Sequence, residues 1–120
     1  MIRKMQEAND AVSGKANETL EVDWAIQRVT KQAELQNLFG KAVGLVNEGR
    51  YQEAAEIFRD LTEKEPQNAR YYAWLGVALY KMERYEEALK ETQRGLKLEP
   101  ENASYQAGLA NMLRKLGRHE

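Results

Sequence analysis

The sequence predicts a single all-α domain built from repeated pairs of antiparallel helices. Three observations carry this prediction: a composition typical of helical proteins, an internal repeat with a period of 34 residues, and turn residues at fixed places in each repeat. Ala, Glu, Lys, Leu and Arg make up just over half of the 120 residues, and only 2 residues are proline. Strong helix formers therefore dominate a chain that has room for one domain.

The charge balance and the reactive residues exclude several classes of function. With 18 basic and 19 acidic residues, the chain lacks the cationic field that gives affinity for nucleic acid, so we expect no nucleic-acid partner. Cysteine is absent, and the single histidine is His119. No thiolate nucleophile, cysteine zinc site or histidine pair is available, and Gly14-Lys15 lacks the spacing of a phosphate loop. We therefore expect no enzyme activity, no metal and no cofactor.

The sequence shows no membrane or export signal. The longest apolar run, from Ala73 to Tyr80, has eight residues, which is less than half of a spanning helix. Residues 1–5 lead into no apolar signal core. These observations predict a cytoplasmic protein that does not insert into a membrane.

The internal repeat is clearest when residues 35–68 are aligned with residues 69–102. A third copy begins at Ala103 and reaches the turn at the end of the chain. The matching segments are Arg50-Tyr-Gln-Glu-Ala54 with Arg84-Tyr-Glu-Glu-Ala88, and Glu65-Pro-Gln-Asn-Ala69 with Glu99-Pro-Glu-Asn-Ala103. A fixed period of this length indicates stacked repeats, each of which is one supersecondary unit.

Each repeat predicts two helices joined by a tight turn. Pro66 and Pro100 follow the second helices, where a missing N–H stops helix propagation. Asn68 and Asn102 stand where the next helix needs an N-cap. We expect helices near residues 35–48, 52–64, 69–82, 86–98 and 103–116, antiparallel in pairs and with no strand among them.

Small residues recur where the two helices of a pair would cross. Position 8 of the repeat holds Ala42, Gly76 and Ala110, position 20 holds Ala54 and Ala88, and position 11 holds Leu45, Leu79 and Leu113. The small residues would let two antiparallel helices approach closely, and the leucines would fill the space beside them.

This pattern resembles the tetratricopeptide repeat (TPR) across residues 35–120. The matching residues are Leu38, Ala42, Leu45, Ala54, Phe58 and Pro66, then Tyr72, Leu75, Gly76, Leu79, Ala88 and Pro100, then Leu109, Ala110 and Leu113. The departures are Lys41, Leu61, Thr92, Gly95 and Gln106, and those at Thr92 and Gly95 predict looser packing in the second repeat. The resemblance implies a right-handed superhelix of helix pairs, an α-solenoid, whose first helices line a concave surface that usually binds a peptide.

The expected organisation is an N-terminal helical segment over residues 1–34, TPR 1 over 35–68, TPR 2 over 69–102, and the first helix and turn of a truncated TPR 3 over 103–120. Two alternatives stay open for residues 1–34. The segment is a degenerate repeat with its turn at residues 13–17, or a helix from about Glu18 runs on into the next unit because residues 31–35 contain no breaker. Either form is expected to cap the array, since about three repeats are needed for stability.

The resemblance also selects candidate peptide-binding residues on the first helices. They are Phe39, Val43, Arg70, Trp74, Val77, Tyr80, Lys81, Asn111 and Arg114. For Trp74 the alternative is a core residue packed against a neighbouring first helix, and for the basic residues it is a solvated face. The carboxylate clamp of related chaperone co-factors is not expected, because its five positions hold Phe39, Val43, Trp74, Ser104 and Gly108.

The sequence thus predicts a non-catalytic module that binds an apolar or amphipathic segment of a partner protein. The alternative is an assembly element or secretion-type chaperone whose groove is filled by its own N-terminal helices or by another copy, which would give a homo-oligomer. The last helix has no second helix after it, so we expect a piece of a longer array. On that expectation Leu109, Leu113 and Leu116 are left uncovered.

Overall fold

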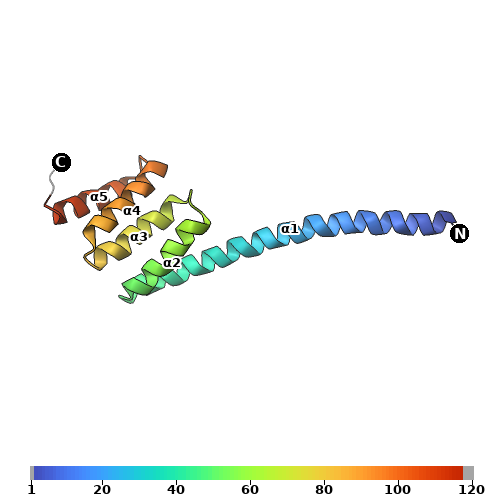
Figure 1. Ribbon diagram of the computed structural model, residues 1–120, viewed down its shortest axis with the longest axis horizontal. Helices are drawn as coiled ribbons and strands as arrows, with labels where there is room; N and C mark the ends of the chain where they lie inside the picture. The colour runs from blue at the N-terminus through green and yellow to red at the C-terminus, as the bar shows by residue number, and fades with distance from the viewer. Residues whose placement is uncertain (1, 118–120) are drawn as a thin grey trace. The chain divides into compact units, whose positions relative to one another are not determined.

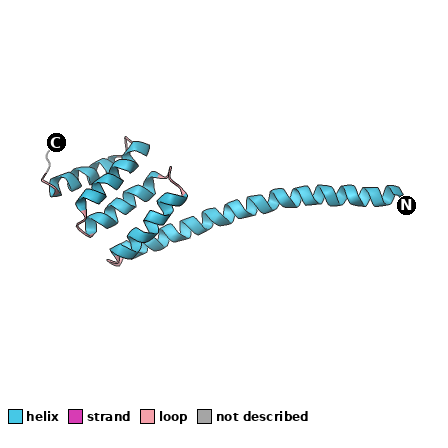
Figure 2. Ribbon diagram, in the orientation of Figure 1, coloured by secondary structure: helices cyan, strands magenta, loops and turns pink. Residues whose placement is uncertain are grey.

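The structure is a computed structural model that describes the backbone of residues 2–117 and the side chains of residues 22–117. It contains five helices: α1 (Ile2–Asn47), α2 (Tyr51–Lys64), α3 (Ala69–Lys81), α4 (Tyr85–Leu98) and α5 (Ala103–Lys115), shown in Figure 1. Within the described residues the remaining segments are turns and short loops, without a strand (Figure 2). The all-α prediction is confirmed, and α2–α5 begin and end within one residue of the predicted bounds.

The chain divides into two compact units, Met1–Leu35 and Gln36–Glu120. The N-terminal unit is helical throughout its described backbone, including residues 13–17, where a degenerate repeat would need a turn. Apolar side chains remain exposed along this helix, and they are Val22, Trp24, Ile26 and Val29 with exposed fractions of 52 to 66%. The Arg28 guanidinium lies 4.2 Å from the centre of the Trp24 ring, a cation–π contact within the same helix.

The second unit contains the repeats, with successive helices packed side by side. Helix α2 packs on α3, α3 on α4 and α4 on α5, while α3 also contacts α5 directly. The core consists of the leucines, alanines and aromatic rings of the repeat pattern, and its largest fully buried side chains are Phe58, Leu61, Tyr71, Leu75 and Leu79. Burial of these apolar side chains, each worth about 1.5–3 kcal/mol, holds the stacked helices together.

The asparagines that precede two of the helices cap them, as the sequence predicts. The side-chain oxygen of Asn68 accepts a hydrogen bond from the Arg70 N–H at 3.2 Å, and that of Asn102 accepts one from the Tyr105 N–H at 3.1 Å. These two N-caps satisfy backbone donors that the first turn of a helix leaves unpaired. Before α4, Arg84 instead makes a forked pair with Glu87, with both N–O distances at 2.8 Å.

The turns inside the repeats share one backbone conformation. Gly49 and Gly117 have φ of +80° and +73°, and the residue midway between them in the 34-residue register, Glu83, has φ of +62°. Glycine adopts this left-handed region freely, whereas a side chain makes it costly. The turn between α3 and α4 therefore contains backbone strain that its two counterparts avoid.

The outer side of α5 is partly uncovered. Leu109, Leu113 and Leu116 are each half-buried, and Ala110, the small residue at position 8, is exposed. Its counterparts Ala42 and Gly76 are buried, because a second helix crosses beside each of them.

Candidate functional site

The first packing seam of the repeats is filled with aromatic rings. We define the first seam as Phe39 of α1, Phe58 of α2, and Tyr71 and Trp74 of α3. The Phe39 ring lies 6.0 Å from Phe58, 5.7 Å from Tyr71 and 6.2 Å from Trp74, measured between ring centroids. Trp74 stacks on Phe58 at 5.9 Å, and Phe58 is completely buried. The first seam is therefore a packed aromatic cluster around the buried rings of Phe58 and Tyr71.

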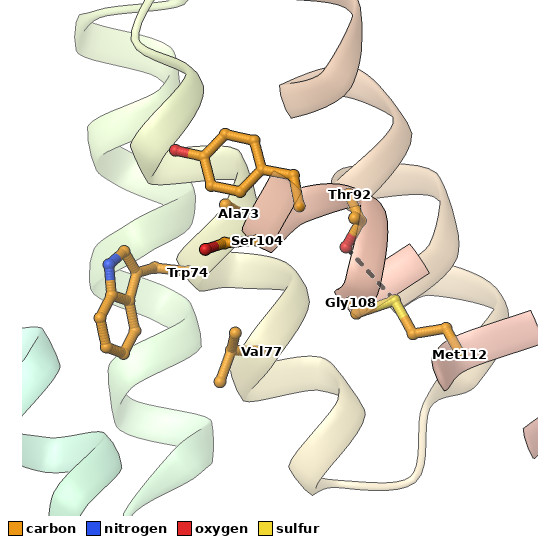
Figure 3. Close-up of a pocket in the computed structure, with 8 residues that line it drawn as sticks. Ala73, Trp74, Val77, Thr92, Ser104, Gly108 and Met112 are labelled. Atoms are coloured by element: carbon orange, nitrogen blue, oxygen red, sulfur yellow. Dashed lines mark hydrogen bonds between the residues drawn. The ribbon is translucent and has the colours of Figure 1, made fainter. Parts of the chain in front are cut away.

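The second seam has the same backbone positions and far smaller side chains. Counting 34 residues on from the first seam gives Ala73 of α3, Thr92 of α4, and Tyr105 and Gly108 of α5, which we define as the second seam. A pocket of about 230 Å³ opens here (Figure 3). Its lining residues are Ala73, Trp74, Val77, Thr92, Ser104, Tyr105, Gly108 and Met112. The pocket occupies the region where the first seam places its rings.

The residues at the bottom of this pocket are closely packed, although the pocket opens to solvent. The Thr92 hydroxyl donates a hydrogen bond to the Met112 sulfur at 3.3 Å, drawn as a dashed line in Figure 3. A Cβ atom at Gly76 would lie 2.4 Å from the Thr92 Oγ1 and 3.3 Å from the Ala88 carbonyl oxygen. Only glycine fits there, so the predicted close approach at Gly76 is confirmed.

Thr92 and Gly95 depart from the repeat pattern and are expected to loosen the packing of the second repeat. Looser packing is found only at Thr92. At Thr92 the missing aromatic ring leaves the pocket. At Gly95 the expectation is wrong, because Gly95 is buried and a Cβ there would lie 3.3 Å from the Ala69 carbonyl oxygen. The missing side chain at Gly95 lets α4 approach the start of α3, which tightens this crossing.

A second pocket continues the first along the same two helices. It measures about 290 Å³ and is lined by Val77, Tyr80, Lys81, Gly108, Asn111 and Met112. Because three of these residues also line the first pocket, the two form one groove between α3 and α5, which we call the α3–α5 groove. The Tyr80 ring is held by an edge-on contact with Tyr85, with ring centroids 5.3 Å apart.

The predicted binding residues fall into two groups. The residues that line the α3–α5 groove are Trp74, Val77, Tyr80, Lys81 and Asn111. Phe39 and Val43 lie on α1, both half-buried, outside the groove. Arg70 places its guanidinium 4.4 Å from the centre of the Phe39 ring, and Arg114 donates a hydrogen bond to the Asn111 side chain.

Trp74 is both a packing residue of the core and a lining residue of the groove, the two alternatives that the sequence left open. Its ring packs in the first seam, as the core alternative proposes, and the half-buried residue also lines the pocket. Figure 3 shows the indole directed away from Gly108. Sequence reasoning did not select Thr92, Tyr105 or Met112, although the departure at Thr92 was the signal that marked this seam.

The first helices of the three repeats, two of which border the groove, carry charge of one sign. Residues 36–47, 69–81 and 103–115 contain no Asp or Glu, and their charged residues are Lys41, Arg70, Lys81, Arg114 and Lys115, all exposed. Helices α2 and α4 carry seven acidic and five basic residues. The groove is thus apolar within and positively charged along its margins.

Two equivalent tyrosines have raised pKa values. Burial is the main cause for Tyr71, whose pKa rises to about 12, and its hydroxyl also donates a hydrogen bond to Glu65 at 2.8 Å. Burial likewise raises the pKa of Tyr105, with Glu99 as a second cause. Both phenols stay protonated at neutral pH, so Tyr105 presents a neutral wall to the pocket.

Neither a metal site nor a membrane-spanning helix is found in the part of the chain that the structure describes. No three His, Cys, Asp or Glu side chains gather in a way that could hold a metal ion within residues 22–117. Among the helices of that same range, none is long and apolar enough to cross a membrane.

Comparison with known proteins gives a family and a set of similar folds. The sequence model of the tetratricopeptide repeat matches residues 45–112. No curated protein matches the chain by sequence. Among solved structures, the type III secretion translocator chaperone SycD of Yersinia enterocolitica superposes with a TM-score of 0.68 at 22% identity, covering 69% of this chain and 63% of SycD. SycD has also been solved with a peptide of the translocator YopD.

Two further structures share the fold. MamA AMB-1 superposes with a TM-score of 0.66 at 25% identity over 71% of this chain and 50% of MamA. The CopN–Scc3 complex gives 0.68 at 18% identity over 71% of this chain and 50% of that chain. This chain therefore spans less than two thirds of the length of these structures.

Proposed function

Because the chain belongs to the tetratricopeptide repeat family, we propose that it is a non-catalytic protein-interaction module that binds an apolar or amphipathic segment of a partner in its α3–α5 groove. One observation carries the proposal: two adjoining pockets, lined mainly by apolar side chains, run between two first helices. Val77, which lines both pockets, is 36% exposed. An apolar surface of this kind loses its contact with water when a partner covers it.

The absence of catalysis in this proposal rests on composition. The chain has no cysteine, and its one histidine is His119. The peptide-binding part gains support from the similar fold of SycD, which binds a peptide of its translocator. The cytoplasmic location expected from the sequence stays a prediction, and cell fractionation tests it.

A peptide library displayed on phage tests the proposal without a known partner. Peptides selected on the whole chain are synthesised, and their affinity is measured by titration calorimetry. Tyr80→Ala should raise Kd about 10-fold, because an aromatic anchor at an interface is worth about 1–2 kcal/mol. Tyr80 suits this test since its ring lies in the groove and packs only against the edge of Tyr85 among the described aromatic residues.

The controls separate loss of binding from loss of folding. Lys90→Ala, on an exposed position of α4 away from both pockets, should leave Kd unchanged. Trp74→Ala is a poor choice for this purpose, because its ring stacks on the buried Phe58 and its loss also weakens the core. Selected peptides that bind Tyr80→Ala as well as the unmodified chain, or a library that yields no binder, would contradict the proposal.

A second function is favoured by the exposed apolar residues of the N-terminal unit. Val22, Ile26 and Val29 follow one another at helical spacing and are 52%, 56% and 66% exposed. We propose as the alternative that such a face fills the groove of another copy, as in an assembly element or secretion-type chaperone. Light scattering that gives a monomer mass excludes this alternative. A dimer that dissociates, and that binds library peptides, only after Val22, Ile26 and Val29 are replaced by Ser supports it.

A further inference from the structure

The two seams of the repeat unit provide an internal template for the occupant of the pocket. The first seam holds rings at Phe39, Phe58 and Trp74, and the residues 34 positions later are Ala73, Thr92 and Gly108. The fourth member is unchanged, because Tyr71 corresponds to Tyr105. The second seam therefore keeps the tyrosine, which packs against Phe39 in the first seam, and lacks the other three rings.

The space and the lining of the pocket suit a ring. The volume is about 230 Å³, whereas an apolar cavity of ~150 Å³ is large enough to hold benzene. Met112 contributes a thioether to the lining, and sulfur packs favourably against aromatic rings. The Thr92 hydroxyl already has its partner in that sulfur, and no buried side-chain polar atom of the described residues lacks a hydrogen bond. The floor consequently offers no unpaired polar group to a guest.

The positive charge along the groove favours acidic residues next to an aromatic residue in the bound segment. Helices α3 and α5, which border the groove, carry four basic residues and no acidic residue over residues 69–81 and 103–115. Lys81 lines the second pocket, and Arg114 bonds to Asn111 at the same end of the groove. A segment with acidic residues next to its ring meets complementary charge, whereas a basic segment is repelled.

We propose that the pocket of the second seam receives an aromatic side chain of the partner segment, flanked in that segment by acidic residues. The ring enters the region that corresponds to the rings of Phe39, Phe58 and Trp74 in the first seam. The partner thus supplies an aromatic contact that this chain lacks in its second seam. This inference rests on the proposed function, because it names the chemistry of the segment that enters the α3–α5 groove.

The experiment uses the whole chain with methionine methyl groups labelled with carbon-13 and short synthetic peptides as probes. The first probe is acetyl-Asp-Ala-Trp-Ala-Asp-amide, and two others replace the Trp by Leu or both Asp by Lys. The Met112 methyl signal should move with the ring current of the first probe, while Met82, which lines neither pocket, should not move. The Leu and Lys probes should each bind about 3- to 10-fold more weakly.

A matched pair of variants assigns the effect to the pocket. Gly108 and Gly40 occupy the same repeat position as Trp74, and a Cβ at either glycine meets no atom within 4 Å. Gly108→Trp should fill the pocket from within and abolish the Met112 shift caused by the probe. Gly40→Trp puts the same side chain on α1 and should leave that shift intact.

The outcomes separate this inference from the proposed function. A Leu probe that binds as tightly as the Trp probe, or a Met112 signal that no probe moves, overturns the inference. Library peptides that bind in the groove without enrichment of aromatic residues also overturn it, and they leave the proposed function standing. A library that yields no binder, together with a Met112 signal that no probe moves, contradicts the proposed function as well.

Discussion

The first and second seams share one backbone plan and differ in three side chains. Phe58 is completely buried beneath two other rings, whereas Thr92 stands at the floor of a pocket of about 230 Å³. Both seams are bordered by helices with the same N-caps and the same following prolines. A repeat can therefore replace a packed core by a pocket through shorter side chains, while it keeps the same order of helices and turns.

The two seams also differ in what they contribute to stability and to the proposed function. The first seam stabilises the stack because Phe58 and Tyr71 are removed from water and the half-buried rings of Phe39 and Trp74 pack around them. The second seam leaves apolar surface open, which is the surface that the proposed partner segment would cover. Substitutions at equivalent positions should accordingly have unequal effects on the free energy of unfolding.

The largest contrast is expected between the two residues at position 24 of the repeat. Phe58→Ala should lower the free energy of unfolding by about 3–5 kcal/mol, because it empties the centre of the first seam. Thr92→Ala should lower it by about 1 kcal/mol, the value of one modest hydrogen bond. Urea unfolding followed by circular dichroism measures both, and Phe58→Leu provides a milder variant. Equal losses at the two positions would show that the seams do not differ in packing.

Gly76 tests how tightly the floor of the second seam is built. Gly76→Leu should destabilise the fold by about 1–3 kcal/mol, because its Cβ would meet Thr92 and the Ala88 carbonyl oxygen. The control is Gly40→Leu, where a Cβ meets nothing within 4 Å and the helix gains about 0.5–1 kcal/mol from the better helix former. A melting temperature for Gly76→Leu equal to that of the unmodified chain would show that α3 and α4 do not meet there.

The two equivalent tyrosines compare the seams by their response to alkali. The pKa of Tyr71 is raised from 10.0 to about 12, so its protonated form stabilises the fold fully below pH 10. That stability is lost as the pH rises towards 12, because the unfolded chain ionises first. Tyr71→Phe should therefore flatten the fall in the urea midpoint across this range.

Tyr105→Phe is the matched variant in the second seam. The pKa of Tyr105 is also raised by burial, but Tyr105 is half-buried where Tyr71 is only 2% exposed. It should flatten the alkaline fall to a smaller extent. An equal or larger effect from Tyr105→Phe would contradict the view that the second seam is the more open one.

The smallest expected effect concerns the turn between the two seams. Glu83→Gly should raise the free energy of unfolding by about 1 kcal/mol, because it removes the strain of a side chain at a φ of +62°. Gly49→Ala, at the equivalent turn with a φ of +80°, should lower it by a similar amount. Thermal unfolding of both variants checks the pair, and a destabilised Glu83→Gly would mean that the glutamate side chain stabilises this turn.

Sequence alone determined the repeat, and with it the helices and caps of the second unit. Local rules suffice for these features: Pro66 ends a helix by lacking an N–H, and Asn68 caps the next by offering an oxygen, whatever lies around them. The sequence also marked Thr92 as a departure from the family pattern, and the pocket lies there. It did not decide between the two forms of residues 1–34, because helix propensity and a weak turn signal compete within that segment.

Only the tertiary structure decided which departures from the repeat pattern leave a pocket and which allow two helices to pack more closely. Thr92 and Gly95 both replace a larger consensus residue, yet one lies beside a pocket and the other under the Ala69 carbonyl oxygen. It also showed that Trp74 packs its ring into the first seam while lining the second. The physical reason is that a cavity depends on all the side chains that converge on a point, and these come from three helices separated along the chain.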